Sequence, residues 1–342
     1  MIIIRPISKK DIEAFTKIAF AAGLGMTSMP KNHKALEKRI QDSENAFANK
    51  NASSAATYLF VLEDLEKGVI GGTCGITPKT GTQIPLSFYK IDKHEKHLTP
   101  GTGLKTMAVL QVVHYSDYFS EICSLYLSKD YRHSGFGRLL SLSRFLFIAA
   151  YPERFDSKIF AAMRGHIDKN GVSLYWEGLG RHFFDASYKT LMDMKDEGSF
   201  DFSRVLPLHP IYIDLLPQAV RDSIGRVHKD TQPALKMLIE EEFMDSLEVD
   251  IFDGGPKIEA KTKSIRCIRE SALEKVTNFT QESLESPDFL ISNNSLNFRA
   301  CLSPIKKNSQ GDVIIPEKVA EALKLKIGDT IRYVSPHKEK RS

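Results

Sequence analysis

Cysteine is scarce in this chain, and its placement excludes two kinds of stabilising site. Four cysteines occur among 342 residues, far apart and without any Cys-x-x-Cys or Cys/His spacing. Disulfide frameworks and zinc sites both need such residues clustered at short intervals. We therefore expect neither a disulfide nor a bound metal. A chain of this length predicts two domains with a small appendage.

Long apolar runs and a strong excess of one charge are also absent. No stretch of about 18 apolar residues occurs, and the first ten residues, MIIIRPISKK, lack the apolar region of a signal peptide. The formal net charge of +4 is small and evenly spread, which argues against nucleic-acid binding but allows a local basic site for an anionic ligand. We expect a soluble, cytoplasmic protein that contacts neither membrane nor nucleic acid.

Periodic hydrophobic patterns predict an α/β fold, with a mixed sheet and helices on both of its faces. Strands are expected at residues 2–7, 58–64, 69–76, 121–128 and 158–165. Helices are expected up to about residue 48, at residues 135–150 and at residues 173–184, the last stopped by Gly180. Between residues 78 and 115 the pattern is less regular.

The second half of the chain repeats the helix-then-strand order more weakly. A helical pattern over residues 233–243 precedes a strand pattern over residues 246–255, which suggests a tandem of two similar halves. The tail differs, because its short strand patterns surround one small helix. We predict three segments: residues 1–190, residues 191–294, and a small β-rich segment at residues 295–342.

A glycine motif joins the strand expected at residues 121–128 to the helix that follows it. The string RHSGFG places Arg132, Gly135 and Gly137 in an R-x-x-G-x-G pattern. Glycine lets the backbone approach a ligand closely, and the N–H groups at a helix start favour an anion, most naturally a pyrophosphate. The alternative is a tight turn without a ligand. A Gly-Lys-Ser/Thr P-loop is absent, and the strand lacks the G-x-G-x-x-G arrangement of a dinucleotide fold.

This strand, loop and helix, with YWEGLG at residues 175–180, resemble the GNAT acyltransferase superfamily. In that superfamily the glycine loop holds the pyrophosphate of acyl-coenzyme A, and the preceding strand opens to present backbone groups to the thioester. The resemblance implies a GNAT-like fold for the first segment and, from the repeated order, a second GNAT-like half. The coenzyme-binding residues that it implies are Leu125, Leu127, Arg132, Gly135 and Gly137.

A narrower resemblance covers nearly the whole chain. Strings typical of the arginine N-succinyltransferase family stand here in the family's order: GLGMTSMP, EICSLYL, LSLSRF, AAMRG, HPIY, IGRVH with TQPA, and DIFDGGP. The resemblance implies transfer of succinyl from succinyl-CoA, a co-substrate, to the α-amine of L-arginine, with no permanently bound cofactor. It places the general acid on His228 and a succinyl-CoA contact on Leu125. We expect the chain to act as a homo-oligomer.

Several alternatives stay open from the residues themselves. His228 stands before polar residues, so a solvated loop histidine explains it as well as a catalytic one does. Another GNAT N-acyltransferase would share the glycine loop and act on a different amine. The tail at residues 312–334 resembles the swapped-hairpin strands of AbrB-type transcription factors, which raises a DNA-binding regulator as a remote alternative. Arg138 and Arg144 fit either a phosphate contact or a water-exposed helix face.

Overall fold

The structure is a computed structural model that describes residues 1–23, 25–26, 28–49, 57–97, 104–168, 170–197, 201–286, 288–308 and 311–338. Its strands are β1 (Ile2–Pro6), β2 (Tyr58–Asp64), β3 (Val69–Thr77), β4 (Leu86–His97), β5 (Leu104–Tyr115), β6 (Ser120–Leu127), β7 (Lys158–Ala162), β8 (Ile211–Tyr212), β9 (Met244–Asp250), β10 (Pro256–Lys261), β11 (Ala272–Thr280), β12 (Phe289–Asn293), β13 (Ala300–Ser303), β14 (Lys306–Lys307), β15 (Val313–Pro316) and β16 (Thr330–Val334). Its α-helices are α1 (Ile12–Ala21), α2 (His33–Ala48), α3 (Phe136–Ala150), α4 (Arg181–Phe184), α5 (Tyr188–Glu197), α6 (Gln218–Arg221), α7 (Gln232–Glu240), α8 (Arg266–Glu270) and α9 (Glu317–Leu323).

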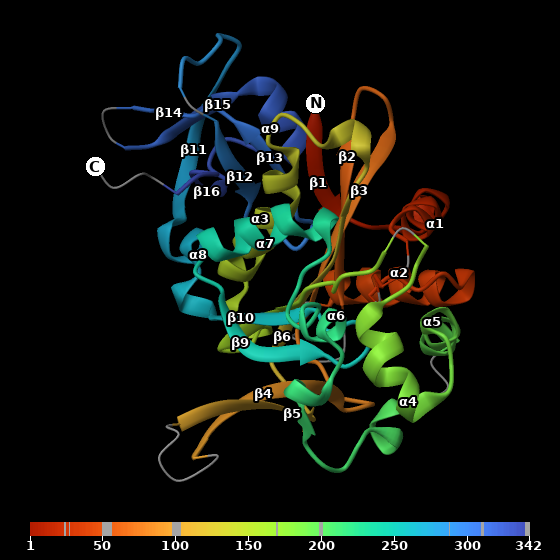
Figure 1. Ribbon diagram of the computed structural model, residues 1–342. Coiled ribbons are helices and arrows are strands. Elements are labelled where there is room, and N and C mark those ends of the chain that lie inside the picture. The colour runs from red at the N-terminus through yellow and green to blue at the C-terminus, as the bar shows by residue number, and fades with distance from the viewer. Residues whose placement is uncertain are drawn as a thin grey trace.

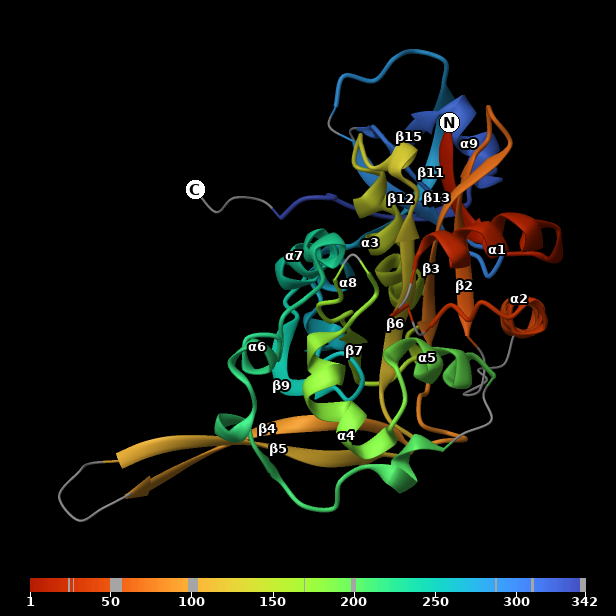
Figure 2. The same cartoon turned by 45° about the vertical axis from the view of Figure 1, so that its right-hand side comes forward.

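The described strands form one continuous sheet, in which the two ends of the chain meet. Its order is β14-β15-β11-β16-β12-β13-β1-β2-β3-β6-β7-β10-β9-β4-β5-β8. The pairs β6–β7 and β11–β15 are parallel, and the other pairs are antiparallel. Strand β1 joins the tail strands to the central strands (Figure 1). Strands β4 and β5 form a long hairpin that extends away from the rest of the molecule (Figure 2).

Alternating side chains of strand β2 fill two hydrophobic cores, one on each face of the sheet. Tyr58, Phe60 and Leu62 pack in the core around α3, whereas Leu59 and Val61 pack in the core formed with α1 and α2. This is the period-two alternation of a strand covered on both faces. The helices α1 and α2 accordingly lie on the opposite side of the central strands from α3 (Figure 1).

Helix α3 is buried on every side along most of its length. Residues 139–148 are all buried, because the helix contacts β3 and β6 of the central sheet and also β12 and β13 of the tail. Arg144 therefore lies in the interior, where its Nε donates to the carbonyl oxygen of Ser141 at 2.9 Å. A water-exposed helix face is thus the wrong interpretation for Arg144. Arg138 pairs with Glu240 of α7 at 2.6 Å.

The α/β fold with a mixed sheet and flanking helices is confirmed, but two local expectations are wrong. Residues 78–115 contain the regular hairpin of β4 and β5. Gly180 does not stop a helix, because its φ of −62° and ψ of −40° are helical and the π-helical turn Trp176–Gly180 runs into α4. A Cβ at Gly180 would lie 2.2 Å from the Trp176 ring, so this glycine allows close packing.

The sheet passes through all three predicted segments, residues 1–190, 191–294 and 295–342. The middle segment contains the helix-then-strand unit of α7 and β9, close to the bounds expected from its pattern. The division of the chain at residues 190 and 294, and the tandem of two GNAT-like halves, stay predictions.

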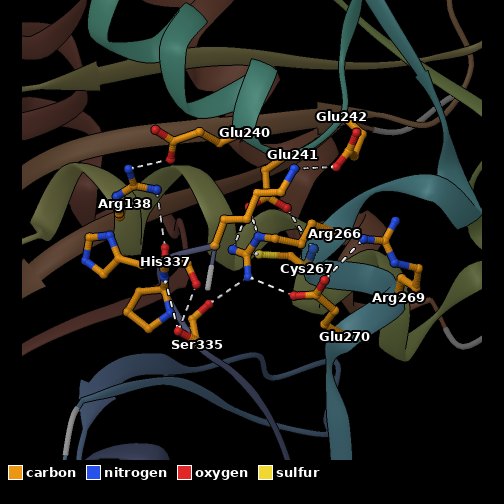
Figure 3. A network of polar contacts seen from close by, with 12 residues as sticks. Arg138, Glu240, Glu241, Glu242, Arg266, Cys267, Arg269, Glu270, Ser335 and His337 are labelled. Carbon is orange, nitrogen blue, oxygen red and sulfur yellow. Dashed lines mark hydrogen bonds and ion pairs between the residues drawn. The ribbon is translucent and has the colours of Figure 1, made fainter. Parts of the chain in front are cut away.

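A polar network ties the residues that follow β16 to the body of the protein (Figure 3). Arg266 of α8 and Glu241, just after α7, are both fully buried, with Nη2 and Oε1 2.6 Å apart. The Nη1 group of Arg266 also donates to the carbonyl oxygen of Ser335 at 3.0 Å. Arg138 donates to the carbonyl oxygen of Pro336 at 3.3 Å. The tail is thereby held against the first turn of α3, the helix that follows the glycine motif.

Replacing Glu241 with alanine is expected to lower the free energy of unfolding by about 3–5 kcal/mol, because it leaves the Arg266 charge buried without its partner. Replacing Glu240, the partly exposed partner of Arg138, should cost about 1 kcal/mol or less. Urea denaturation of the two variants measures the difference. Equal losses would show that the buried pair contributes no more than the exposed one.

Candidate active site

Strand β6 contains a bulge opposite β3. Gly75 pairs with Cys123 and Thr73 pairs with Tyr126, so β6 has one residue more than β3 between these two pairs. Ser124 lies at the bulge with a φ of 53°, a left-handed conformation that is uncommon for any residue except glycine. A bulge of this kind interrupts the ladder of hydrogen bonds and turns the strand.

Strand β6 also separates from its parallel neighbour β7 just before the bulge. The last residues paired between them are Glu121 and Phe160, and β6 continues to Leu127 without β7 beside it. Leu125 and Leu127 lie on this stretch, with their side chains packed against the core around α3. Their backbone therefore borders the opening between the two strands. Their contact with a coenzyme stays a prediction.

The glycine motif lies directly after this open stretch of β6. Ser134 and Gly135 take consecutive left-handed conformations, with φ of 50° and 76°, and Gly135 is the N-cap of α3. Gly137 lies in the first helical turn, whose N–H groups have no partner within the helix. The Nε of Arg132 donates to the carbonyl oxygen of Leu127 at 2.9 Å. The structure thus brings these predicted residues together at one end of the opening.

His228 is buried at the other side of the opening, just before a 3-10 turn that leads into α7. Its backbone N–H donates to the carbonyl oxygen of Arg164 at 2.9 Å. Its Nδ1 accepts the backbone N–H of Asp230 at 3.2 Å, so in this arrangement the ring proton is on Nε2. Burial, together with the charge of Arg164, lowers the pKa of His228. The solvated loop histidine is therefore not what the structure shows.

Hydrogen bonds join the segment that contains His228 to two segments far from it in the sequence. The N–H of Gly165 donates to the carboxylate of Asp253 at 2.8 Å, and the N–H of Gly225 donates to the carbonyl oxygen of Gly254 at 2.8 Å. An antiparallel bridge joins Gly165 to Val227. These segments carry the strings AAMRG, IGRVH and DIFDGGP. Three of the strings on which the family resemblance rests thus meet around one histidine.

The register of the parallel strands shows how the predicted residues face one another. Ser120 lies level with Ile159, and Glu121 with Phe160. Continuing this register past the last pair places Leu125 about level with Arg164, the residue whose carbonyl oxygen binds His228. On this register, the residue that binds the backbone of His228 lies about level with the bulge, and the glycine motif follows after β6.

A cluster of charged side chains near this opening was missed by the sequence analysis. Burial raises the pKa of Glu121 to about 7, against the opposing charges of Lys195 and Arg39. Burial and then the neighbouring Asp250 raise the pKa of Asp253 to about 7. The two aspartates belong to DIFDGGP, so two acidic residues in a string typical of the family were a signal that could have found them.

The residues that the structure describes contain neither a cluster of metal ligands nor a membrane-spanning helix. No group of three or more histidine, cysteine, aspartate or glutamate side chains there is arranged to hold a metal ion. None of the helices described combines the length and the apolar character needed to cross a bilayer.

An opened strand that leads into a glycine motif at a helix start is the arrangement that the resemblance to acyltransferases predicts. The family model described as arginine N-succinyltransferase beta subunit matches residues 2–267. A second model, described as the C-terminal domain of the same subunit, matches residues 275–335. The chain belongs to the arginine N-succinyltransferase family. The second match assigns the tail to this family, so the tail no longer calls for a DNA-binding regulator.

Similar proteins support the same assignment. The chain is 35% identical over 339 residues to proteins named arginine N-succinyltransferase from Escherichia coli (strain 55989 / EAEC) and Shigella sonnei (strain Ss046), covering 98% of this chain and 97% of each relative. A solved structure of arginine/ornithine succinyltransferase subunit AI from Pseudomonas aeruginosa superposes with a TM-score of 0.89 at 29% identity. That match covers 99% of both chains.

Proposed function

We propose that this chain transfers the succinyl group of succinyl-CoA to the α-amine of L-arginine. The observation that carries the proposal is the 35% identity, over almost the whole chain, to proteins named arginine N-succinyltransferase. The separation of β6 from β7, beside the bulge in β6, supports a site for the reaction there, with His228 as its catalytic residue. A cytoplasmic location and a homo-oligomeric assembly stay predictions.

Succinyl-CoA would lie along β6 with its pyrophosphate at the start of α3. Left-handed Ser134 and Gly135 present backbone N–H groups there, and the helix dipole favours negative charge. The thioester would then lie beside the backbone from Leu125 to Leu127, which β7 leaves unpaired. Donors already in place for the developing oxyanion are typically worth about 3–4 kcal/mol. Arg132 braces this arrangement by binding the Leu127 carbonyl oxygen.

The nucleophile is the α-amine because it binds a proton less tightly than the guanidinium group of arginine does. A guanidinium stays protonated at any working pH and is a poor nucleophile, whereas an α-ammonium loses its proton near neutrality. The neutral amine attacks the thioester carbon, the tetrahedral intermediate collapses with loss of the coenzyme A thiolate, and the proton of the amine nitrogen passes to water, which leaves the amide. The N–H of His228 at Nε2 would donate a hydrogen bond to the sulfur as charge builds on it.

The cysteines favour direct transfer over a covalent acyl-cysteine. All four are buried. Cys123 lies next to the bulge, but burial and the charge of Glu121 raise the pKa of its thiol. Burial raises the pKa of Cys74 and of Cys301 to about 12. A thiolate is the reactive form, so these side chains are poor nucleophiles at neutral pH.

A thiol-release assay with purified protein tests the proposed function. Succinyl-CoA is supplied with L-arginine, L-ornithine, L-lysine or no acceptor. We expect release of coenzyme A with L-arginine well above the rate without an acceptor. Release with another amine and none with L-arginine would support the alternative N-acyltransferase and overturn the proposal.

Donor selectivity provides a separate prediction. The kcat/KM for succinyl-CoA should exceed that for acetyl-CoA by about 10²-fold or more, because groups that bind the distal carboxylate stay unpaired when acetyl binds. The same thiol-release assay measures both constants at saturating L-arginine. Comparable constants for the two donors would mean that no distal carboxylate is recognised.

A further inference from the structure

Arg164 follows β7, and no described residue forms a hydrogen bond with its guanidinium. Its Nε is buried and unbonded, and within the described ranges no ion pair reaches the side chain. A buried donor left unsatisfied costs about 1–3 kcal/mol, and more when the group is charged. Arg5 and Arg266 are instead paired with Asp11 and Glu241. The arrangement around Arg164 therefore suits an anion that comes from outside the chain.

The acidic residues near Arg164 do not neutralise it. Asp253 and Asp230 both exert an electrostatic effect on it. Asp253 already accepts the N–H groups of Gly165 and Gly255, at 2.8 and 2.9 Å, and its raised pKa of about 7 weakens its charge at neutral pH. The Asp230 side chain is 56% exposed, so water screens it. The guanidinium keeps its capacity to bind a further carboxylate.

A second unbonded donor lies beside Arg164. Tyr188, at the start of α5, is 2% exposed, and its hydroxyl has no hydrogen-bond partner among the residues that the structure describes. A Cβ built on Gly25 would lie 2.7 Å from Cδ1 of Ile167, 3.0 Å from Nε of Arg164 and 3.1 Å from the hydroxyl of Tyr188. Both donors therefore converge on the backbone of Gly25, at a point packed too closely for a side chain. Two converging donors match the two oxygens of a carboxylate.

These two donors lie close to where the proposed reaction would take place. The carbonyl oxygen of Arg164 holds His228, and the register of β6 and β7 places Arg164 about level with Leu125. An anion bound by Arg164 is therefore part of a molecule that reaches the opening. Both substrates of the proposed reaction carry a carboxylate close to their reacting atoms: succinyl two methylenes from the thioester carbon, and arginine on the carbon that bears the amine.

We propose that Arg164 and Tyr188 form a carboxylate-binding subsite that positions one of the two substrates in the opening. This inference rests on the proposed function. It adds the side chains that would bind a substrate carboxylate, which the proposed function left unassigned. The planar fork of a guanidinium binds a carboxylate through two parallel hydrogen bonds, which fixes its orientation as well as its place. The subsite thus selects substrates that carry a carboxylate and holds the reacting atoms in line.

The test compares wild type with Arg164→Met on two pairs of substrates. Succinyl-CoA is compared with butyryl-CoA, which replaces the distal carboxylate by a methyl group, and L-arginine is compared with agmatine, which lacks the α-carboxylate. We expect one of these two preferences, measured as a ratio of kcat/KM, to fall by about 10²-fold in the variant. The preference that falls identifies the carboxylate that is bound.

Further variants separate recognition from folding. Arg164→Lys keeps the charge without the fork and should recover part of the lost preference, and Tyr188→Phe should lower the same preference by a smaller factor. Arg204→Met, at a side chain 83% exposed, is the matched control and should change neither ratio. Thermal melts establish that each variant is folded, and calorimetric binding of succinyl-CoA and butyryl-CoA gives a readout besides activity.

Two kinds of failure are distinguishable. A folded Arg164→Met protein that keeps both preferences, together with a Tyr188→Phe protein that does the same, overturns the subsite while wild-type activity upholds the proposed function. A wild-type protein that does not succinylate L-arginine overturns the proposed function. In that case, calorimetry still tests the subsite. Tighter binding of succinyl-CoA than of butyryl-CoA by wild type, lost in Arg164→Met, supports carboxylate binding. Equal binding of the two by wild type counts against carboxylate binding.

Discussion

Gly135→Val is expected to raise the KM for succinyl-CoA by about 10–100-fold, while the KM for L-arginine stays nearly unchanged. Gly135 has a φ of 76°, and a left-handed conformation costs a residue with a side chain about 1–2 kcal/mol. Its Cβ would lie 3.4 Å from Leu302, so the branched methyl groups of valine add a steric conflict. The loop must then move, and its N–H groups no longer meet the pyrophosphate.

A matched variant separates this effect from strain alone. Gly328 has a φ of 95°, and a Cβ there meets no atom within 4 Å. Gly328→Val should therefore carry a similar backbone strain in the tail without changing the KM for succinyl-CoA. Direct titration with coenzyme A gives the affinity independently of turnover. Equal coenzyme A affinity in Gly135→Val and wild type would remove the glycine motif from the binding site.

The features predicted best were those that depend on residues close together in the sequence. The strand, glycine motif and helix from β6 to α3 follow from local patterns and appear close to their predicted bounds. Arg144 shows the limit of such patterns. Its helix contacts tail strands from the other end of the chain, so a polar residue in an apolar pattern lies buried and not on a surface.

The hairpin of β4 and β5 shows the same limit for strands. Much of it extends away from the body, as Figure 2 shows, and Lys93 and His94 are exposed. A strand with little contact to a hydrophobic core buries neither face, so its residues need not alternate between apolar and polar. Its regular pairing depends on the partner strand, which a search for periodicity along one segment does not detect.

The site needed tertiary information that local patterns do not carry. His228 was identified from a string typical of the family, and its place depends on bonds to segments near Gly165 and Gly254. Arg164 and Tyr188 come from different elements and meet beside Gly25. The sequence shows an arginine and a tyrosine at these positions, but only the fold shows that Nε of Arg164 and the hydroxyl of Tyr188 have no hydrogen-bond partner among the described residues.

His228→Ala is expected to lower kcat by roughly 10–100-fold, with little change in either KM. A hydrogen bond to a charged group contributes about 1.5–3 kcal/mol, and the sulfur becomes charged only as the thioester breaks. Rapid-mixing measurements of coenzyme A release at saturating substrates give kcat. His228→Gln restores a side-chain N–H and should recover part of the loss, which it would not do if a full proton transfer from the ring were required.

The pH dependence separates the two protonation states of the ring. Because burial and Arg164 lower the pKa of His228, the ring is neutral at pH 7 and above, and Nε2 keeps its proton while Nδ1 accepts from Asp230. The ratio of wild-type to His228→Ala kcat should therefore stay constant between about pH 7 and 9. A ratio that falls through this range would mean that the imidazolium is the donor. A folded His228→Ala protein with wild-type kcat would remove His228 from the reaction, and a raised KM for L-arginine alone would leave it the role of positioning the acceptor.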